Sequence, residues 1–116
     1  MDPVALREKL VEIFPELVQW FATSDFRLDD DYSLTYCGAF MECSHFVRER
    51  LDQLRPAELE RIATFVSECM ETPGTDLDDA AATCFLENLS HEPAADALMP
   101  YLYGEAAAYL RGFYAE

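Results

Sequence analysis

The sequence predicts an all-α protein that folds as a single domain over residues 1–116. Apolar residues recur at spacings of three and four in almost every long segment, and no segment alternates convincingly between apolar and polar residues. Prolines and glycines mark short links between these segments, and short links favour antiparallel neighbours. We therefore expect about five to six helices, packed as an irregular bundle or a short stack of helical hairpins.

The first helix is expected to begin at Asp2 and Pro3, because an N-cap side chain followed by proline at the first helical position is a typical helix start. Its apolar stripe consists of Leu6, Leu10, Ile13, Phe14, Leu17 and Phe21. Pro15 interrupts that stripe, which predicts either a kink or two short helices that meet near Phe14. Residues 23–33 are polar, acidic and aperiodic, and we expect a loop there.

The second helix is expected to be capped by Ser33 and to continue to about Leu54. One apolar stripe runs along it, formed by Leu34, Cys37, Phe40, Met41, Ser44, Val47, Leu51 and Leu54. Pro56 opens a third helix, whose first turn carries acidic residues that suit the helix dipole. This third helix has the most regular amphipathic pattern in the chain.

Thr72–Gly74 is expected to end the third helix, and either Thr75 or Asp76 to cap the fourth. The fourth helix is apolar around most of its circumference, which indicates a central helix covered by several neighbours. Together, the helices over residues 56–91 have the size of a HEAT-type hairpin.

A short fifth helix is expected to open at Pro93 and to end or kink at Pro100. Gly104 then separates it from a last helical segment.

The formal net charge is −15 in a chain that is 51% hydrophobic. Acidic chains that stay disordered are usually poor in large apolar residues, whereas this chain has eight Phe, six Tyr and one Trp. We therefore expect a folded protein with a strongly negative surface. With eight Lys and Arg against 23 acidic residues, direct binding to nucleic acid or to anionic membranes is disfavoured. A basic protein partner, a cation or plain solubility remain open.

The N-terminal segment lacks the basic region and long apolar core of a signal peptide, and no window approaches about 18 uninterrupted apolar residues. We therefore expect a cytoplasmic protein without a membrane span. Its cysteines, Cys37, Cys43, Cys69 and Cys84, are expected to be reduced and packed as small apolar residues. No Cys-x-x-Cys motif predicts a zinc knuckle or a thioredoxin-type pair.

Glu42, His45 and Glu49 lie on one strip of the second helix, away from its apolar stripe. Glu-x-x-His is the ligand spacing of di-iron helical bundles, but the second half of such a site is incomplete, because Glu87 and His91 are four residues apart. We expect a solvated charged face, with His45 paired to a carboxylate. A metal site is kept as the alternative, with Glu42, His45, Glu87 and His91 as ligands; no other cofactor is expected.

Acidic residues form two clusters, Asp25 with Asp29–Asp31 and Asp76 with Asp78 and Asp79. Neither predicts a calcium loop, because Ala80 and Ala81 stand where the second cluster would need a ligand and a glycine. Carboxylates in a first helical turn stabilise the helix, which explains the second cluster. The first cluster has no such explanation, so we expect it to belong to an interaction surface.

Two further residues stand out by their position on a helix. Phe46 lies opposite the apolar stripe of its helix, which indicates either a partner contact or packing against the terminal segment. Asn88 lies on the apolar side of the fourth helix and is expected to bond to a neighbouring backbone.

No catalytic arrangement is recognisable, and we do not expect an enzyme. Neither histidine has a usable nucleophile beside it, since Cys43 and His45 diverge by about 200° on a helix. The four glycines are scattered singly and form no phosphate-binding loop.

Two stretches, LREKLVEIFPEL and FVSECMETPGTDLDDAAATCFLENLS, resemble small uncharacterised bacterial helical proteins, some of which look like toxin-immunity proteins. The resemblance lies in helix punctuation and apolar pattern. It implies a compact helical domain with a binding role, and it transfers no functional residue.

The leading hypothesis is a non-enzymatic protein that binds a basic protein partner through its acidic surface, in an immunity-like or regulatory role. The residues expected to contact that partner are Asp29, Asp30, Asp31, Glu42, Phe46 and Glu49. The metal-binding protein is the second hypothesis. A nucleic-acid mimic is the third, because it would need acidic residues in regular rows rather than in clusters. In a fourth hypothesis the acidity serves solubility alone and the aromatic C-terminus is the working surface.

Overall fold

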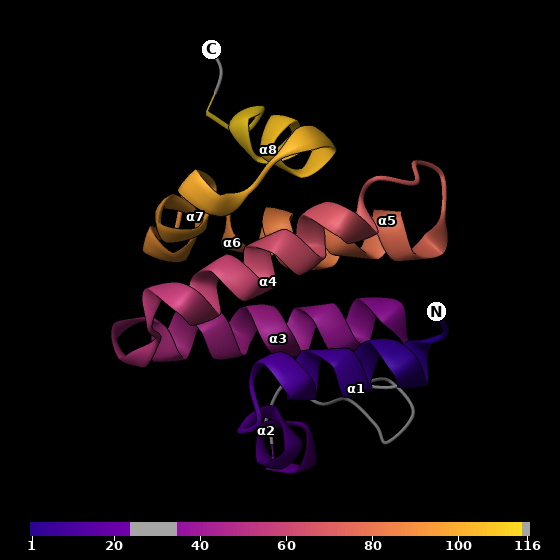
Figure 1. The fold of residues 1–116 in the computed structure, drawn as a ribbon, viewed down its shortest axis with the longest axis vertical. Helices are drawn as coiled ribbons and strands as arrows, with labels where there is room; N and C mark the ends of the chain where they lie inside the picture. The colour runs from indigo at the N-terminus through magenta and orange to yellow at the C-terminus, as the bar shows by residue number, and fades with distance from the viewer. Residues whose placement is uncertain (24–34, 115–116) are drawn as a thin grey trace.

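Helix α3 (Tyr36–Arg50) lies at the centre of the computed structural model, which describes residues 1–23 and 35–114. Helices α1 (Pro3–Ile13) and α2 (Leu17–Thr23) cover one side of α3, and the segment from α5 to α6 packs along another side (Figure 1). Nine of the 15 residues of α3 are buried. The chain is an all-α single domain, as the apolar periodicity predicted.

The first apolar stripe forms two helices, which settles the alternatives left open at Pro15. The carboxylate of Asp2 accepts the backbone N–H of Ala5 at 2.8 Å, and Pro3 opens α1. Helix α1 ends at Ile13 and α2 begins at Leu17. Because of this split, the described residues form seven helices, one more than expected. None of them combines the length and the apolar character needed to cross a membrane.

Local capping fixes the starts of the next two helices. Thr35 caps α3, because its hydroxyl accepts the backbone N–H of Gly38 at 2.9 Å; Ser33, the expected cap, lies outside the described residues. Helix α4 (Pro56–Cys69) opens at Pro56, as expected. The side chain of Glu58 accepts the backbone N–H of Arg55 at 2.9 Å and closes that first turn.

The fourth predicted helix runs without a break from Asp76 to Leu89 and is capped by Thr75, whose hydroxyl accepts the N–H of Asp78 at 3.0 Å. Helices α5 (Asp76–Ala80) and α6 (Glu87–Leu89) are its two ends, and its middle, Ala81–Leu86, is a π-helix. We call Ala81–Leu86 the π segment. Nothing in the apolar periodicity predicted this wider turn.

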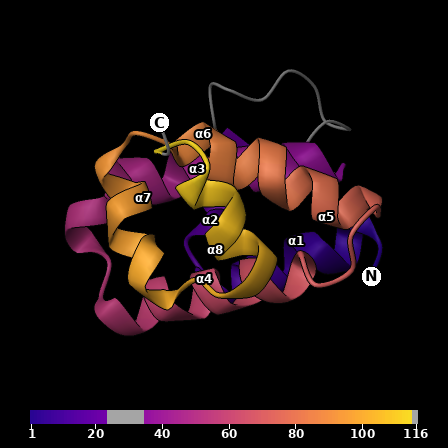
Figure 2. The ribbon, with the colours of Figure 1, turned by 90° about the horizontal axis from the view of Figure 1, so that it is seen from above.

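The last helices close the fold above α4. Helices α7 (Pro93–Leu98) and α8 (Gly104–Arg111) are joined through a 3₁₀ turn at Met99–Tyr101 that contains Pro100. Helix α8 lies above the space between α4 and the α5–α6 helix and contacts both (Figure 2). The main contact of the α5–α6 helix is with α3, so residues 56–91 are not organised chiefly as the HEAT-type hairpin that their length suggested.

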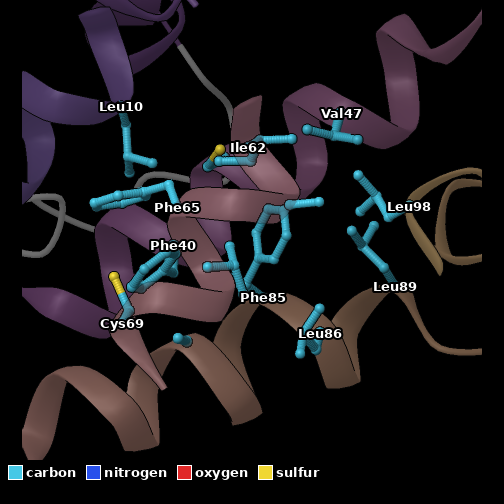
Figure 3. Close-up of a cluster of buried hydrophobic side chains, with 14 of the residues drawn as sticks. Leu10, Phe40, Val47, Ile62, Phe65, Cys69, Phe85, Leu86, Leu89 and Leu98 are labelled. Carbon is cyan, nitrogen blue, oxygen red and sulfur yellow. The ribbon is translucent and has the colours of Figure 1, made fainter. Parts of the chain in front are cut away.

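One apolar core joins these helices. Figure 3 shows Phe40 of α3, Phe65 of α4 and Phe85 of the π segment meeting with Leu10 of α1 and Leu98 of α7 around them. The ring centroids of Phe40 and Phe85 are 5.9 Å apart, and those of Phe40 and Phe65 are 6.5 Å apart. The three rings place α3 in direct contact with both α4 and the π segment.

Cys37 and Cys84 form a disulfide, which corrects the expectation that all four cysteines are reduced. Their Cα atoms are 5.3 Å apart, although 47 residues separate them in sequence. The bond joins the first turn of α3 to the π segment. Cys43 and Cys69 are free and buried, as expected for thiols packed as small apolar residues.

Reduction of the Cys37–Cys84 disulfide is expected to lower the free energy of unfolding by about 2–4 kcal/mol, because the unfolded chain gains freedom when the long loop is opened. The measurement is urea unfolding with and without dithiothreitol. A Cys37→Ser/Cys84→Ser variant should be indifferent to the reductant. The finding of four reactive thiols in unfolded, unreduced protein, instead of the two of Cys43 and Cys69, would contradict the crosslink.

Candidate functional site

A hollow of about 450 Å³ lies between the start of α5, the π segment and α8. Three carboxylates line it, those of Asp78, Asp79 and Glu105. The remaining lining residues are Met70, Pro73, Ala82, Thr83, Ala108 and Tyr109. No Lys, Arg or His is among them, so the lining carries only negative formal charge.

Local folding holds these carboxylates in place at little cost. Asp78 and Asp79 lie in the first turn of α5, and Glu105 lies in the first turn of α8. A helix N-terminus stabilises negative charge, so each position suits the residue that occupies it. The side chain of Asp78 also accepts the backbone N–H of Gly74 at 3.0 Å. Gly74 has a φ of +85°, a backbone conformation that favours glycine.

Two more carboxylates, those of Glu68 and Glu71, lie at the other end of a helix, where the local field opposes them. They are at the C-terminal end of α4, which has no basic residue in its last turn. A helix C-terminus disfavours negative charge, so helix stability does not explain this placement. Glu68 lines a second hollow of about 380 Å³ together with Asp76, on the far side of the turn that links α4 to α5.

We refer to Glu68, Glu71, Asp76, Asp78, Asp79 and Glu105 together as the acidic end. The tyrosines beside it respond to its field. Burial raises the pKa of the Tyr109 phenol, and the charges of Glu87 and Asp79 raise it further. The pKa of exposed Tyr103 is also raised, by desolvation and by Glu71 and Glu68. Both shifts indicate a negative potential at this end of the molecule.

Glu42 and His45 are buried, so the expectation of a solvated face for them is wrong. Only 2% of Glu42 and 9% of His45 are exposed, whereas Glu49 is exposed as expected. The physical reason is that α2 packs against α3, so a second face of α3 is covered in addition to its apolar stripe. Within the described part of the chain, Oε2 of Glu42 has no hydrogen-bond partner.

Burial is also the main influence on the protonation of His45. It lowers the pKa of the imidazole, because removal from water disfavours the charged form. The charge of Arg48 lowers this pKa further, while the carboxylates of Glu42 and Glu49 act in the opposite direction. The three residues predicted from the helical strip are thus close enough to influence one another.

The alternative metal ligands are not gathered into one site. Over residues 1–23 and 35–114, no group of three or more His, Cys, Asp or Glu side chains is placed to hold a metal ion. Glu87 and His91 are exposed near the end of α6. His91 packs instead against Tyr114, with ring centroids 4.9 Å apart, and its backbone N–H donates to the Tyr114 hydroxyl at 2.9 Å.

Phe46 is a core residue, which corrects the expectation that it contacts a partner. Only 2% of it is exposed, and its ring packs against Phe14 at 5.2 Å and Trp20 at 5.6 Å between centroids. Its neighbours thus come from the α1–α2 region and not from the terminal segment. Asp25 and Asp29–Asp31 lie outside the described residues, so their place on an interaction surface stays a prediction.

Asn88 connects two helices, as expected, although through a side chain. Its amide donates to the Ser44 hydroxyl of α3 at 3.1 Å, and that hydroxyl donates to the backbone carbonyl of Met41 at 2.6 Å. Glu105, Glu68 and Glu71 were missed from the sequence. For Glu68 and Glu71 a signal existed, because two acidic residues end a helix that has no basic residue to balance them.

The free energy of unfolding is expected to fall as the pH is lowered from about 7 to 5.5, with His45 as one cause. Because the folded-state pKa of His45 lies below its ordinary value, the unfolded chain takes up a proton that the folded chain resists. This contribution is present above the ordinary pKa and is lost below it. Urea unfolding at both pH values should show a smaller fall for His45→Gln than for the wild type.

The matched control is His91→Asn, which alters the exposed histidine and keeps a side chain that tolerates its φ of +65°. That control should retain the wild-type pH dependence. An unchanged fall in His45→Gln would show that His45 does not couple protonation to folding.

The comparisons with known proteins agree with the extent of this fold. Neither the curated proteins nor the solved structures contained a match to the chain. A family model described as a domain of unknown function, DUF7674, matches residues 7–114. The matched range extends from α1 to the end of the described chain, and so it includes the acidic end and the covered helix α3. The chain belongs to the DUF7674 family.

Proposed function

We propose that the protein is a non-enzymatic binding protein that takes a positively charged segment of a protein partner at its acidic end. The observation that carries this proposal is the hollow of about 450 Å³ lined by Asp78, Asp79 and Glu105 with no basic residue. A neutralising or regulatory role in the cytoplasm fits this activity.

The lining suits the long side chains of lysine and arginine. Their aliphatic stems pack on apolar surface while the charged head stays near water or carboxylates. Met70 and Ala82 supply the apolar surface, and Asp79 and Glu105 supply the charge. The ring of Tyr109 offers a face to a cation. A long basic side chain can therefore make apolar, ionic and aromatic contacts in one hollow.

Complementary charge also favours fast association with a basic partner and repels nucleic acid. The placement of Glu68 and Glu71 supports a role in binding, because the dipole of α4 opposes both charges in the free protein. A basic partner would relieve that repulsion. Since Phe46 and Glu42 are buried, they are not part of the proposed contact surface.

The first experiment is capture of partners from native-host lysate on the immobilised protein, with elution by a salt gradient and identification by mass spectrometry. A stoichiometric basic protein released at moderate salt supports the proposal. Capture of a DNA-binding protein that nucleic acid displaces would favour the nucleic-acid mimic instead. The absence of any salt-sensitive partner would count against the proposal.

With the partner in hand, Asp79→Asn/Glu105→Gln is expected to slow association at low salt by about threefold to tenfold, because it removes two charges from the hollow. The matched control is Glu8→Gln/Asp96→Asn, which removes two exposed carboxylates from α1 and α7. Association rates measured by surface plasmon resonance over a salt series distinguish the two. Equal slowing by both variants would mean that net charge acts without a defined site.

A further inference from the structure

A second hollow, of about 320 Å³, lies near the opposite end of α4 from the acidic end. It forms where the turn between α1 and α2, the end of α3 and the first turn of α4 come together. Figure 1 shows α4 running between these two regions. Its floor is aromatic, because Phe14 and Phe46 both line it and are each 2% exposed.

Arg50 gives this hollow its character. Its guanidinium lies 5.9 Å from the ring centroids of both Trp20 and Phe46. Within residues 1–23 and 35–114, the ion pairs of α3 and α4 join Arg55 to Glu58, and no carboxylate lies within ion-pair distance of Arg50. In a chain of net charge −15, a half-buried arginine held on aromatic rings without a carboxylate is a donor with unused capacity.

Two carboxylates line the same hollow. Glu16 lies at the exposed rim, on the turn between α1 and α2. Glu58 lies in the first turn of α4, where its Oε1 accepts the N–H of Arg55 and lies 3.6 Å from Nε of the same residue. The hollow therefore offers one guanidinium, two carboxylates and an apolar floor completed by Leu54.

We propose that this hollow binds a free zwitterionic α-amino acid with an apolar side chain. Arg50 takes the carboxylate, because its planar guanidinium matches two oxygens. Glu16 and Glu58 take the ammonium group, and the apolar side chain packs on Phe14, Phe46 and Leu54. The volume lies at the small end of ligand pockets, which suits a ligand of amino-acid size.

Net charge selects the zwitterion over its charged analogues. The overall charge of −15 lowers the local concentration of a free anion, and Arg50 repels a cation inside the hollow. A zwitterion has no net charge and satisfies both signs in the lining. The proposal does not depend on the proposed partner binding at the acidic end, because the two hollows share no lining residue.

The test is titration of the full chain with L-phenylalanine, followed by calorimetry and by the fluorescence of Trp20, the one tryptophan in the sequence. We expect a single saturable site in the millimolar range or tighter. N-acetyl-L-phenylalanine, which lacks the ammonium group, and L-phenylalanine amide, which lacks the carboxylate, are each expected to bind at least about tenfold more weakly. Equal binding of all three compounds, or no saturable binding, would overturn the proposal.

Variants assign the two charges. Arg50→Gln is expected to weaken L-phenylalanine binding at least about tenfold and to leave the weak binding of the amide unchanged, whereas Arg111→Gln on α8 is the control that leaves both unchanged. Glu16→Gln, at an exposed site, should weaken L-phenylalanine but not the N-acetyl compound, which keeps the test valid if Arg50→Gln fails to fold. Wild-type affinity in a folded Arg50→Gln or in Glu16→Gln would refute the assignment of that residue.

Discussion

The covering of α3 on several sides is the constraint on which the rest of the structure depends. Helices α1 and α2 close one face of it, and the π segment, α6 and α7 close another. A helix of 15 residues with nine of them buried must take polar groups into the interior, and α3 takes Glu42, Ser44 and His45. Ser44 is satisfied by Asn88 and Met41, so the polar contacts inside the protein also set how α6 meets α3.

Charge is distributed so that the core stays apolar while the surface near α5 is strongly negative. Most carboxylates of the acidic end lie in first turns of helices, where the backbone itself stabilises them. Glu68 and Glu71 do not share this benefit, which separates the part of the negative surface that folding explains from the part that it does not. The Arg50 hollow has the opposite composition, since its one cation lies on aromatic rings in a chain dominated by acids.

Helix starts could be predicted from the sequence because capping involves only residues that are close in the chain. Asp2, Pro56, Thr75 and Pro93 mark starts that the structure has in the same places. The burial of Glu42 and Phe46 could not be predicted, because it depends on α2 packing against a face of α3 that looks polar in isolation. The pairing of Cys37 with Cys84 was missed for the same reason, since no rule of spacing links residues on two helices that meet only in the fold. The acidic hollow combines α5 with α8, and its third carboxylate, that of Glu105, comes from a helix that sequence reasoning did not place beside α5.

The π segment makes the length of its helix as strictly constrained as its composition. A sequence that places apolar residues all around a helix usually describes one that is covered on every side, but a wide turn gives the same pattern by shifting the phase between two narrower apolar faces. Deletion of a single residue from Ala81–Leu86 would restore the ordinary turn and rotate everything after it by about 100°. Leu86 and Leu89 would then leave the core that they now share with α3 and α7, and Asn88 would turn away from Ser44. Insertions and deletions, more than substitutions, are therefore the changes that this helix cannot absorb.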